Sequence, residues 1–200
     1  MDISALIALL AFMVPMCFTP GPNNVLCAAH GSRHGVRKTI PLIGGMAIGW
    51  SVLGLGIGAG AVFIEQNESL IQILSYLGAG YIAYLGYKVA VASSIKDEGG
   101  AEDVLGPRTG FVLQIVNGKA WIHFVVLMTS FGTIFGAGLG GKVALVILNL
   151  SFGFPAVLSW TAFGTLLRRI FSGEDSGIWL NRGLGLLLFL VAIWIALPHE

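Results

Sequence analysis

Two long apolar stretches of this chain are interrupted, one by Thr19-Pro20-Gly21-Pro22-Asn23-Asn24 and the other by Asn117-Gly118-Lys119-Ala120. Helix breaks are costly in hydrocarbon, because the freed backbone N–H and C=O groups find no water there. Membrane proteins tolerate such breaks where they line a cavity or bind a ligand. Lys119 adds a charge to the second break. The two segments therefore predict a binding site made by two broken membrane helices.

The composition predicts an integral membrane protein embedded in a lipid bilayer. The chain has 200 residues, of which 56% are hydrophobic and only 10% are charged. Its mean hydropathy is +0.85. A globular chain carries about 25% charged residues, so these charges are too few to cover a water-facing surface. We expect one transmembrane domain over residues 1–200. The net charge of +1 gives no argument for nucleic-acid binding.

Apolar stretches predict an all-α fold with six transmembrane helices. A spanning helix needs about 20 apolar residues. The last stretch is short and must extend back over Trp179, with Arg182 at the interface. Five spans are the main alternative to six. The six expected helices cover residues 3–29, 39–64, 69–87, 109–141, 143–167 and 178–197.

Basic residues fall on alternate loops, which predicts the orientation. The positive-inside rule makes their side cytoplasmic, so both termini would be periplasmic and the number of spans even. Six spans then divide into two inverted halves of three helices, with a break in the first helix of each half. Both breaks would lie about 15 Å from the inner boundary, near the midplane. The basic residues are Arg33, Arg37, Lys38, Lys88, Lys96, Arg108, Arg168, Arg169 and Arg182.

The first break predicts a site for an anion. Pro20 and Pro22 remove two backbone donors, so we expect the helix to stop near Phe18 and to restart near Pro22 or Asn23. The N-terminus of the new half-helix would present free N–H groups and a partial positive charge, which suit a carboxylate. A simple proline kink is the alternative.

The second break places Lys119 among apolar residues, where its charge needs a partner. None of the six stretches contains Asp or Glu. The available partners are carbonyls freed by the breaks, Asn117, or a bound carboxylate. His123 lies one turn further on the same helix face, either as a packing residue or as a proton carrier. Asn149, Ser151 and Pro155 could form a lesser break in the fifth helix, but we interpret them as packing residues.

Cysteines and glycines carry weaker signals. Cys17 and Cys27 would lie about 15 Å apart on a continuous helix, too far for a disulfide, and we interpret them as packing residues. Glycine pairs with GxxxG spacing predict close helix packing. These pairs are Gly45/Gly49, Gly54/Gly58, Gly56/Gly60, Gly132/Gly136 and Gly136/Gly140.

Motifs spread over nearly the whole chain resemble those of one family. They are Pro20-Gly21-Pro22-Asn23, Gly31-Ser32-Arg33-His34-Gly35, the glycines Gly44, Gly45 and Gly49, Gly80-Tyr81-Ile82-Ala83-Tyr84-Leu85-Gly86-Tyr87-Lys88, and Asn117-Gly118-Lys119-Ala120. The chain resembles the LysE/RhtB family of amino-acid exporters. That family usually has Asn-Pro-Lys-Ala in the fourth helix, where this chain has Gly118.

 The resemblance implies a secondary exporter in the bacterial inner membrane. It implies proton influx as the driving force, with no enzymatic activity, no cofactor and no metal. With no intramembrane carboxylate for a cationic side chain, we expect neutral amino acids to be favoured over basic ones. A homo-oligomer is left open, as are two other classes of protein, a passive channel or pore and a thiol-relay membrane protein. The expected substrate-binding residues are Pro20, Gly21, Pro22, Asn23, Asn24, Asn117 and Lys119, with His123 in proton coupling.

Overall fold

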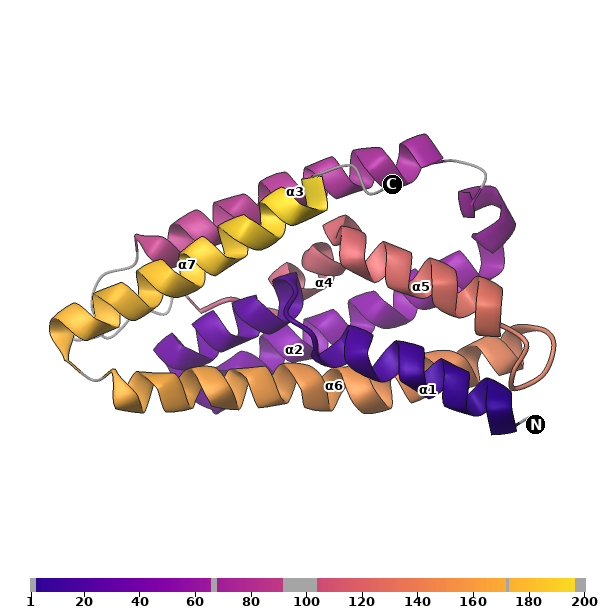
Figure 1. Ribbon diagram of the computed structural model, residues 1–200, viewed down its shortest axis with the longest axis horizontal. Coiled ribbons are helices and arrows are strands. Elements are labelled where there is room, and N and C mark those ends of the chain that lie inside the picture. The colour runs from indigo at the N-terminus through magenta and orange to yellow at the C-terminus, as the bar shows by residue number, and fades with distance from the viewer. Residues whose placement is uncertain (1–2, 66–67, 92–103, 172, 197–200) are drawn as a thin grey trace.

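The structure is a computed structural model that describes residues 3–65, 68–91, 104–171 and 173–196. Every regular element among these residues is an α-helix, which confirms the all-helical class (Figure 1). The helices are α1 (Ile3–Phe18), α2 (Pro22–Glu65), α3 (Glu68–Ala90), α4 (Pro107–Val116), α5 (Gly118–Phe131), α6 (Leu139–Ile170) and α7 (Glu174–Ala196). By length and composition, α2, α6 and α7 can each cross a membrane, and the bent α4–α5 pair makes a fourth candidate. The six spans and their inverted halves stay predictions.

The chain reverses inside α2, at Gly35. Cys27 Sγ lies 3.8 Å from Met46 Sδ, although 19 residues of straight helix would separate them by about 28 Å. Gly35 has φ 77° and ψ 171°, a conformation that favours glycine. A single residue therefore makes the turn, and the loop expected between residues 29 and 39 is wrong.

Both predicted helix breaks are present. α1 ends at Phe18 and α2 begins at Pro22, as the two prolines predict. The second break lies at Asn117, where α4 and α5 meet with a bend of 66°.

The boundary expected between the stretches 109–141 and 143–167 is wrong. α5 already ends at Phe131 and α6 begins at Leu139, before residue 143. Gly136 and Gly138 have positive φ in the turn between them. These residues are apolar, so hydropathy does not distinguish the turn from a helix.

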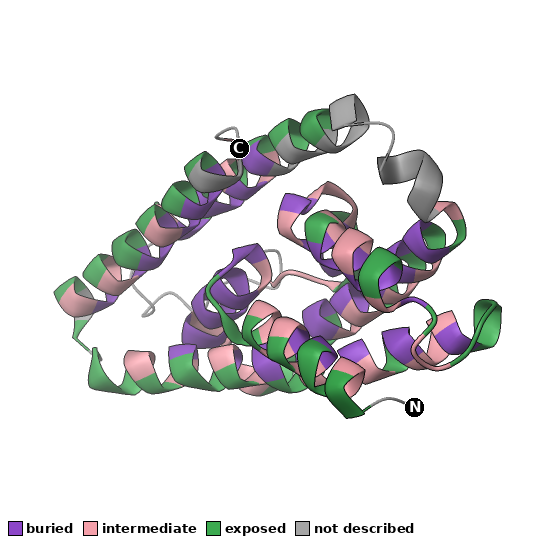
Figure 2. Cartoon of the chain, turned by 45° about the vertical axis from the view of Figure 1, so that its right-hand side comes forward, coloured by how far each residue is buried: buried purple, intermediate pink, exposed green. Residues whose placement is uncertain are grey.

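The core forms around α2, which packs along α6 and α4, while α3 packs along α7. Figure 2 shows buried residues on the inward faces of the helices and exposed residues on their outer faces. Close approach of α2 and α4 depends on glycine, because a Cβ at Gly45 would lie 2.6 Å from Pro107 Cα. Gly49, Gly54 and Gly58 also meet neighbouring helices.

Two of the other glycine pairs do not pack as predicted. A Cβ at Gly56 or Gly60 would meet no atom within 4 Å, and the same holds for Gly136 and Gly140. Gly136 lies in the turn before α6, so the GxxxG spacing there does not belong to one helix.

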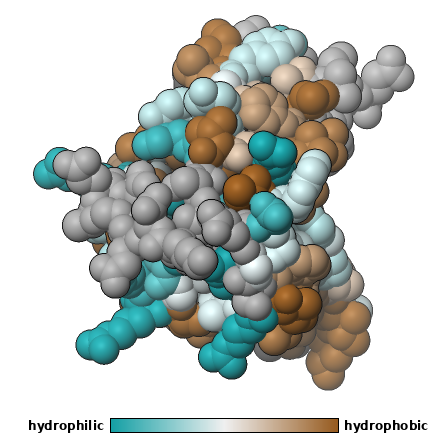
Figure 3. Space-filling view, turned by 90° about the vertical axis from the view of Figure 1, so that its left-hand side faces the viewer, coloured by the Kyte–Doolittle hydropathy of each residue, from teal (hydrophilic) through white to brown (hydrophobic). Residues whose placement is uncertain are grey.

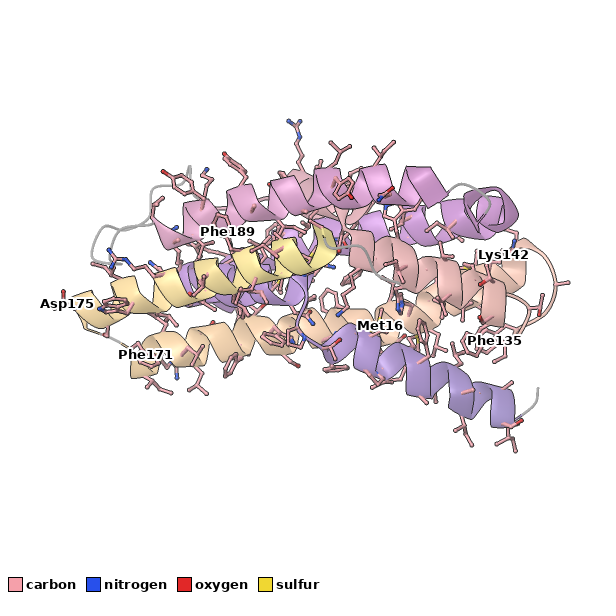
Figure 4. All side chains as sticks on the ribbon, turned by 45° about the horizontal axis from the view of Figure 1, so that its top comes forward. Met16, Phe135, Lys142, Phe171, Asp175 and Phe189 are labelled. Atoms are coloured by element: carbon pink, nitrogen blue, oxygen red, sulfur yellow. The ribbon has the colours of Figure 1, made fainter. Side chains whose placement is uncertain are left out.

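Along its long axis, the molecule has two ends and a central region. In Figure 4, Phe171 and Asp175 lie at one end, Phe135 and Lys142 lie at the other, and Met16 lies between them. Viewed from the end that holds the α6–α7 junction, the molecule shows several hydrophilic side chains on its surface (Figure 3). Lys96, residue 197 and both chain termini lie outside the described residues.

Candidate functional site

The two helix breaks meet at one cavity of about 50 Å³. A buried water needs about 10–15 Å³, so this is room for about three to five waters. Met16 lines the cavity and lies in the central region of Figure 4, so the cavity lies there too. Seven of the eight expected site residues line it, namely Gly21, Pro22, Asn23, Asn24, Asn117, Lys119 and His123, whereas Pro20 is not among the lining residues.

Lys119 connects the two breaks. Its Nζ donates to the Thr19 hydroxyl at 2.9 Å and to the Thr19 carbonyl at 3.2 Å. The lysine therefore donates to one of the partners expected from the sequence, a carbonyl freed by the first break. A Cβ at Gly21 would lie 2.9 Å from Lys119 Cδ, so the glycine leaves room for the lysine stem.

Side-chain amides join the start of α2 to the end of α4. Asn23 and Gln114 exchange two hydrogen bonds of 2.9 and 3.0 Å, and Asn117 Nδ2 donates to Asn23 Oδ1 at 3.3 Å. Asn24 Nδ2 donates to the carbonyls of Cys17 and Thr19. The asparagines therefore hold the broken ends in place. Gln114 was not predicted as a site residue. Its indication in the sequence is an amide side chain one turn before Asn117.

His123 forms the wall of the cavity on α5. Its Nε2 lies 2.7 Å from Asn149 Oδ1, and its ring stacks on Phe12 with centroids 5.4 Å apart. Cys17 Sγ donates to the same Asn149 oxygen at 3.8 Å. α6 runs unbroken past Asn149, as expected, but this asparagine also lines the cavity, a role that its sequence context did not indicate.

Two tryptophans that were not predicted as site residues donate to carbonyls at the broken ends. Trp160 Nε1 donates to the Phe18 carbonyl at 3.1 Å, at the end of α1. Trp121 Nε1 donates to the Ile115 carbonyl at 2.7 Å, near the end of α4. Backbone carbonyls at helix ends lack intrahelical partners, so each indole stabilises one half of a break.

The cavity is suited to a negative charge. The N-termini of α2 and α5 both begin at its wall, and each carries a partial positive charge. Lys119 adds a full charge, and none of the described residues that line the cavity is Asp or Glu. Among the described residues, no group of His, Cys, Asp and Glu could hold a metal ion. Cys17 and Cys27 are both free, as expected.

Broken helices that meet at a central cavity are typical of the binding sites of membrane transporters. The chain belongs to the family described as LysE type translocator, whose family model matches residues 14–198. This confirms the resemblance seen in its motifs, and the family description is that of a transporter rather than an enzyme.

Curated relatives of the chain are named as efflux proteins. The "Cysteine/O-acetylserine efflux protein" of Salmonella typhimurium (strain LT2) is 32% identical over 179 residues, which cover 88% of this chain and 90% of the relative. The protein of the same name from Escherichia coli (strain K12) is 31% identical over 180 residues, with the same coverage. No solved structure matches the chain.

Proposed function

We propose that this protein is a secondary active exporter of small neutral amino acids across the bacterial inner membrane. The observation that carries the proposal is the bond from Lys119 to Thr19, which brings a charged side chain into a cavity bounded by both helix breaks. The relatives' names, cysteine/O-acetylserine efflux protein, support an amino acid as the substrate.

The substrate carboxylate would bind at Lys119. Thr19 offers the ammonium group only neutral oxygen acceptors. A carboxylate would replace them with charge-assisted hydrogen bonds, which are roughly twice as strong as neutral ones. The nearby N-termini of α2 and α5 favour the same negative charge.

Neutral substrates are favoured because the cavity offers no partner for a second positive charge. In the part of the chain that the structure describes, no Asp or Glu lines it. A Lys or Arg side chain would bring an unpaired cation next to Lys119, and desolvating such a charge is costly. We expect a basic amino acid to be exported poorly.

Proton influx would drive export, with His123 and Lys119 as the groups that exchange protons. They lie one turn apart on α5 and both line the cavity. Alternating access would expose the cavity first to the cytoplasm and then to the periplasm. The basic residues on alternate loops support a cytoplasmic position for those loops and hence periplasmic termini.

Counterflow in proteoliposomes tests this proposal. Vesicles that contain the purified full chain are loaded with unlabelled cysteine under reducing conditions, and entry of labelled cysteine is followed. We expect trans-stimulation by internal cysteine and none by internal arginine. Lys119→Met should abolish counterflow, whereas Lys88→Met, at an exposed position outside the cavity, should retain it. Flux without trans-stimulation would indicate a pore and contradict the proposal.

A further inference from the structure

A second cavity, of about 550 Å³, lies between the first arm of α2, residues 22–34, and the end of α3. Its walls include parts of two motifs that the substrate site does not use, residues 31–35 and 80–88, and none of its described lining residues belongs to the cavity at the helix breaks. Ligand pockets have volumes of about 300–1,000 Å³, so this cavity has room for a ligand of its own. In Figure 1, the first arm of α2 and α3 both end on the side of the molecule that holds the α6–α7 junction.

The second cavity carries positive charge where these two helix segments end. Arg33 lies two residues before the turn at Gly35, and Lys88 lies two residues before the end of α3. Lys88 Nζ lies 5.8 Å from the centre of the Tyr84 ring. The exposed rings of Tyr84 and Tyr87 are typical of the membrane interface, where lipid head groups lie. None of the described lining residues is Asp or Glu, so this end of the cavity favours a negatively charged group.

Most of the remaining wall of the second cavity is apolar. Leu26 and Arg33 lie on one face of α2, seven residues apart, which is about 10 Å along the helix axis. The lining of α2 therefore changes from charged near its turn to apolar toward the first helix break. Leu85 and Val89 on α3 are buried and face the same cavity. The apolar lining residues are Leu26, Ala29, Leu85, Val89, Val91 and Leu105.

His30 fixes the wall of the second cavity, because both of its ring nitrogens have partners within the chain. Its Nε2 accepts from the Leu105 N–H at 3.0 Å, and its Nδ1 lies 2.8 Å from Thr39 Oγ1. The Thr39 hydroxyl in turn donates to the Gly35 carbonyl at 2.9 Å. The buried histidine therefore holds Leu105 against α2 and leaves the recognition of a charged ligand to Arg33 and the residues of α3.

We propose that the second cavity binds an anionic phospholipid, with the phosphate at Arg33 and Lys88 and an acyl chain along Leu26 and Leu85. A phospholipid has its charged and apolar parts in the same order as this wall. Basic pockets between membrane helices bind anionic head groups. A free phosphate would leave the apolar wall without a partner. The cavity is separate from the substrate cavity, so the inference does not depend on the proposed function.

Native mass spectrometry of the purified full chain in detergent tests the inference by measuring the affinity for one added lipid. Phosphatidylglycerol is the anionic lipid, and phosphatidylcholine with the same acyl chains is the zwitterionic control. We expect the wild type to bind phosphatidylglycerol at least about tenfold more tightly than phosphatidylcholine. Arg33→Gln and Lys88→Gln should each weaken phosphatidylglycerol binding about fivefold, because one basic residue contributes about 1 kcal/mol to the attraction of an anionic lipid. Lys38→Gln should leave it unchanged, since Lys38 is exposed near the same turn and does not line the cavity.

Three results would overturn the inference. The first is equal binding of the two lipids by the wild type. The second is a loss of binding in Lys38→Gln as large as that in Lys88→Gln, which would indicate attraction by the whole basic surface. The third is displacement of bound phosphatidylglycerol by inorganic phosphate, which would show that the apolar wall is not used. If Arg33→Gln fails to fold, the comparison of Lys88→Gln with Lys38→Gln decides the inference.

The chain's own carboxylates are the competing occupants of the basic end. Four acidic residues lie between Val91 and Leu105 in the sequence, outside the described residues, namely Asp97, Glu98, Glu102 and Asp103. A variant with Asn and Gln in their place should bind phosphatidylglycerol about as tightly as the wild type. Selective binding that appears only in this variant would overturn the inference. Lipid binding without any counterflow would contradict the proposed function and leave the inference intact.

Discussion

Lys119 Nζ lies 2.9 Å from Thr19 Oγ1, across 100 positions of sequence. This bond joins two helix breaks and gives the ammonium group of the half-buried Lys119 neutral partners. We expect Thr19→Val to reduce transport by less than about fivefold, because the Thr19 carbonyl stays in place and a single neutral hydroxyl contributes about 1 kcal/mol. Initial counterflow rates measure the effect. A complete loss of transport in Thr19→Val would mean that the hydroxyl itself binds substrate.

Gly45 and its neighbour Gly44 form a matched pair for testing the approach of α2 to α4. A Cβ at Gly45 would lie 2.6 Å from Pro107 Cα, whereas a Cβ at Gly44 would meet no atom within 4 Å. We expect Gly45→Ala to destabilise the fold by about 1–3 kcal/mol or more. Gly44→Ala should be neutral or stabilise by up to about 1 kcal/mol. The two variants are compared by their melting temperatures in detergent. Equal melting temperatures would contradict the close packing of α2 against α4 at Gly45.

Gly118 occupies the first position of α5, where the family usually has proline. Asn117 before it is extended, with φ −87° and ψ 97°, which a following proline tolerates. Proline is also favoured at the first position of a helix. We expect Gly118→Pro to fold and to raise stability by about 0.4–1 kcal/mol. Ala120→Pro is the control, because it removes the bond from the Ala120 N–H to the Asn117 carbonyl. If Gly118→Pro is as unstable as Ala120→Pro, the backbone conformation described for this break is contradicted.

Trp121 supplies a hydrogen bond that the end of α4 needs. Replacing it by Phe leaves the Ile115 carbonyl without the indole donor. We expect Trp121→Phe to lower stability by about 1–3 kcal/mol, because a partly buried acceptor loses its partner. Trp179→Phe is the control, since Trp179 is 67% exposed. Thermal unfolding in detergent measures both variants, and equal stability would show that another donor reaches Ile115.

The features that were predicted best from the sequence depend on the type of a single residue and not on its distant partners. Pro20 and Pro22 cannot continue a helix, so the break between Phe18 and Pro22 followed from residue types alone. Lys119 was predicted as a site residue because it places a charge in an apolar stretch. The all-helical class followed from hydropathy.

The parts that escaped prediction depend on turns and partners distant in sequence. Gly136 and Gly138 lie in a turn within an apolar, glycine-rich segment, where hydropathy does not mark a boundary. Gln114, Asn149 and Trp160 belong to the site through partners on other helices. One sequence does not indicate which of its polar residues meet across the bundle.

The central claim is that Lys119 binds the substrate carboxylate. The most direct test compares the binding of cysteine with that of cysteamine, which is cysteine without its carboxylate, to purified wild-type and Lys119→Met proteins by calorimetry under reducing conditions. We predict that the wild type binds cysteine at least about tenfold more tightly than cysteamine, as a charge-assisted bond of about 1.5–3 kcal/mol requires. In Lys119→Met the difference should disappear. A preference for cysteine that is equally large in Lys119→Met would contradict the claim.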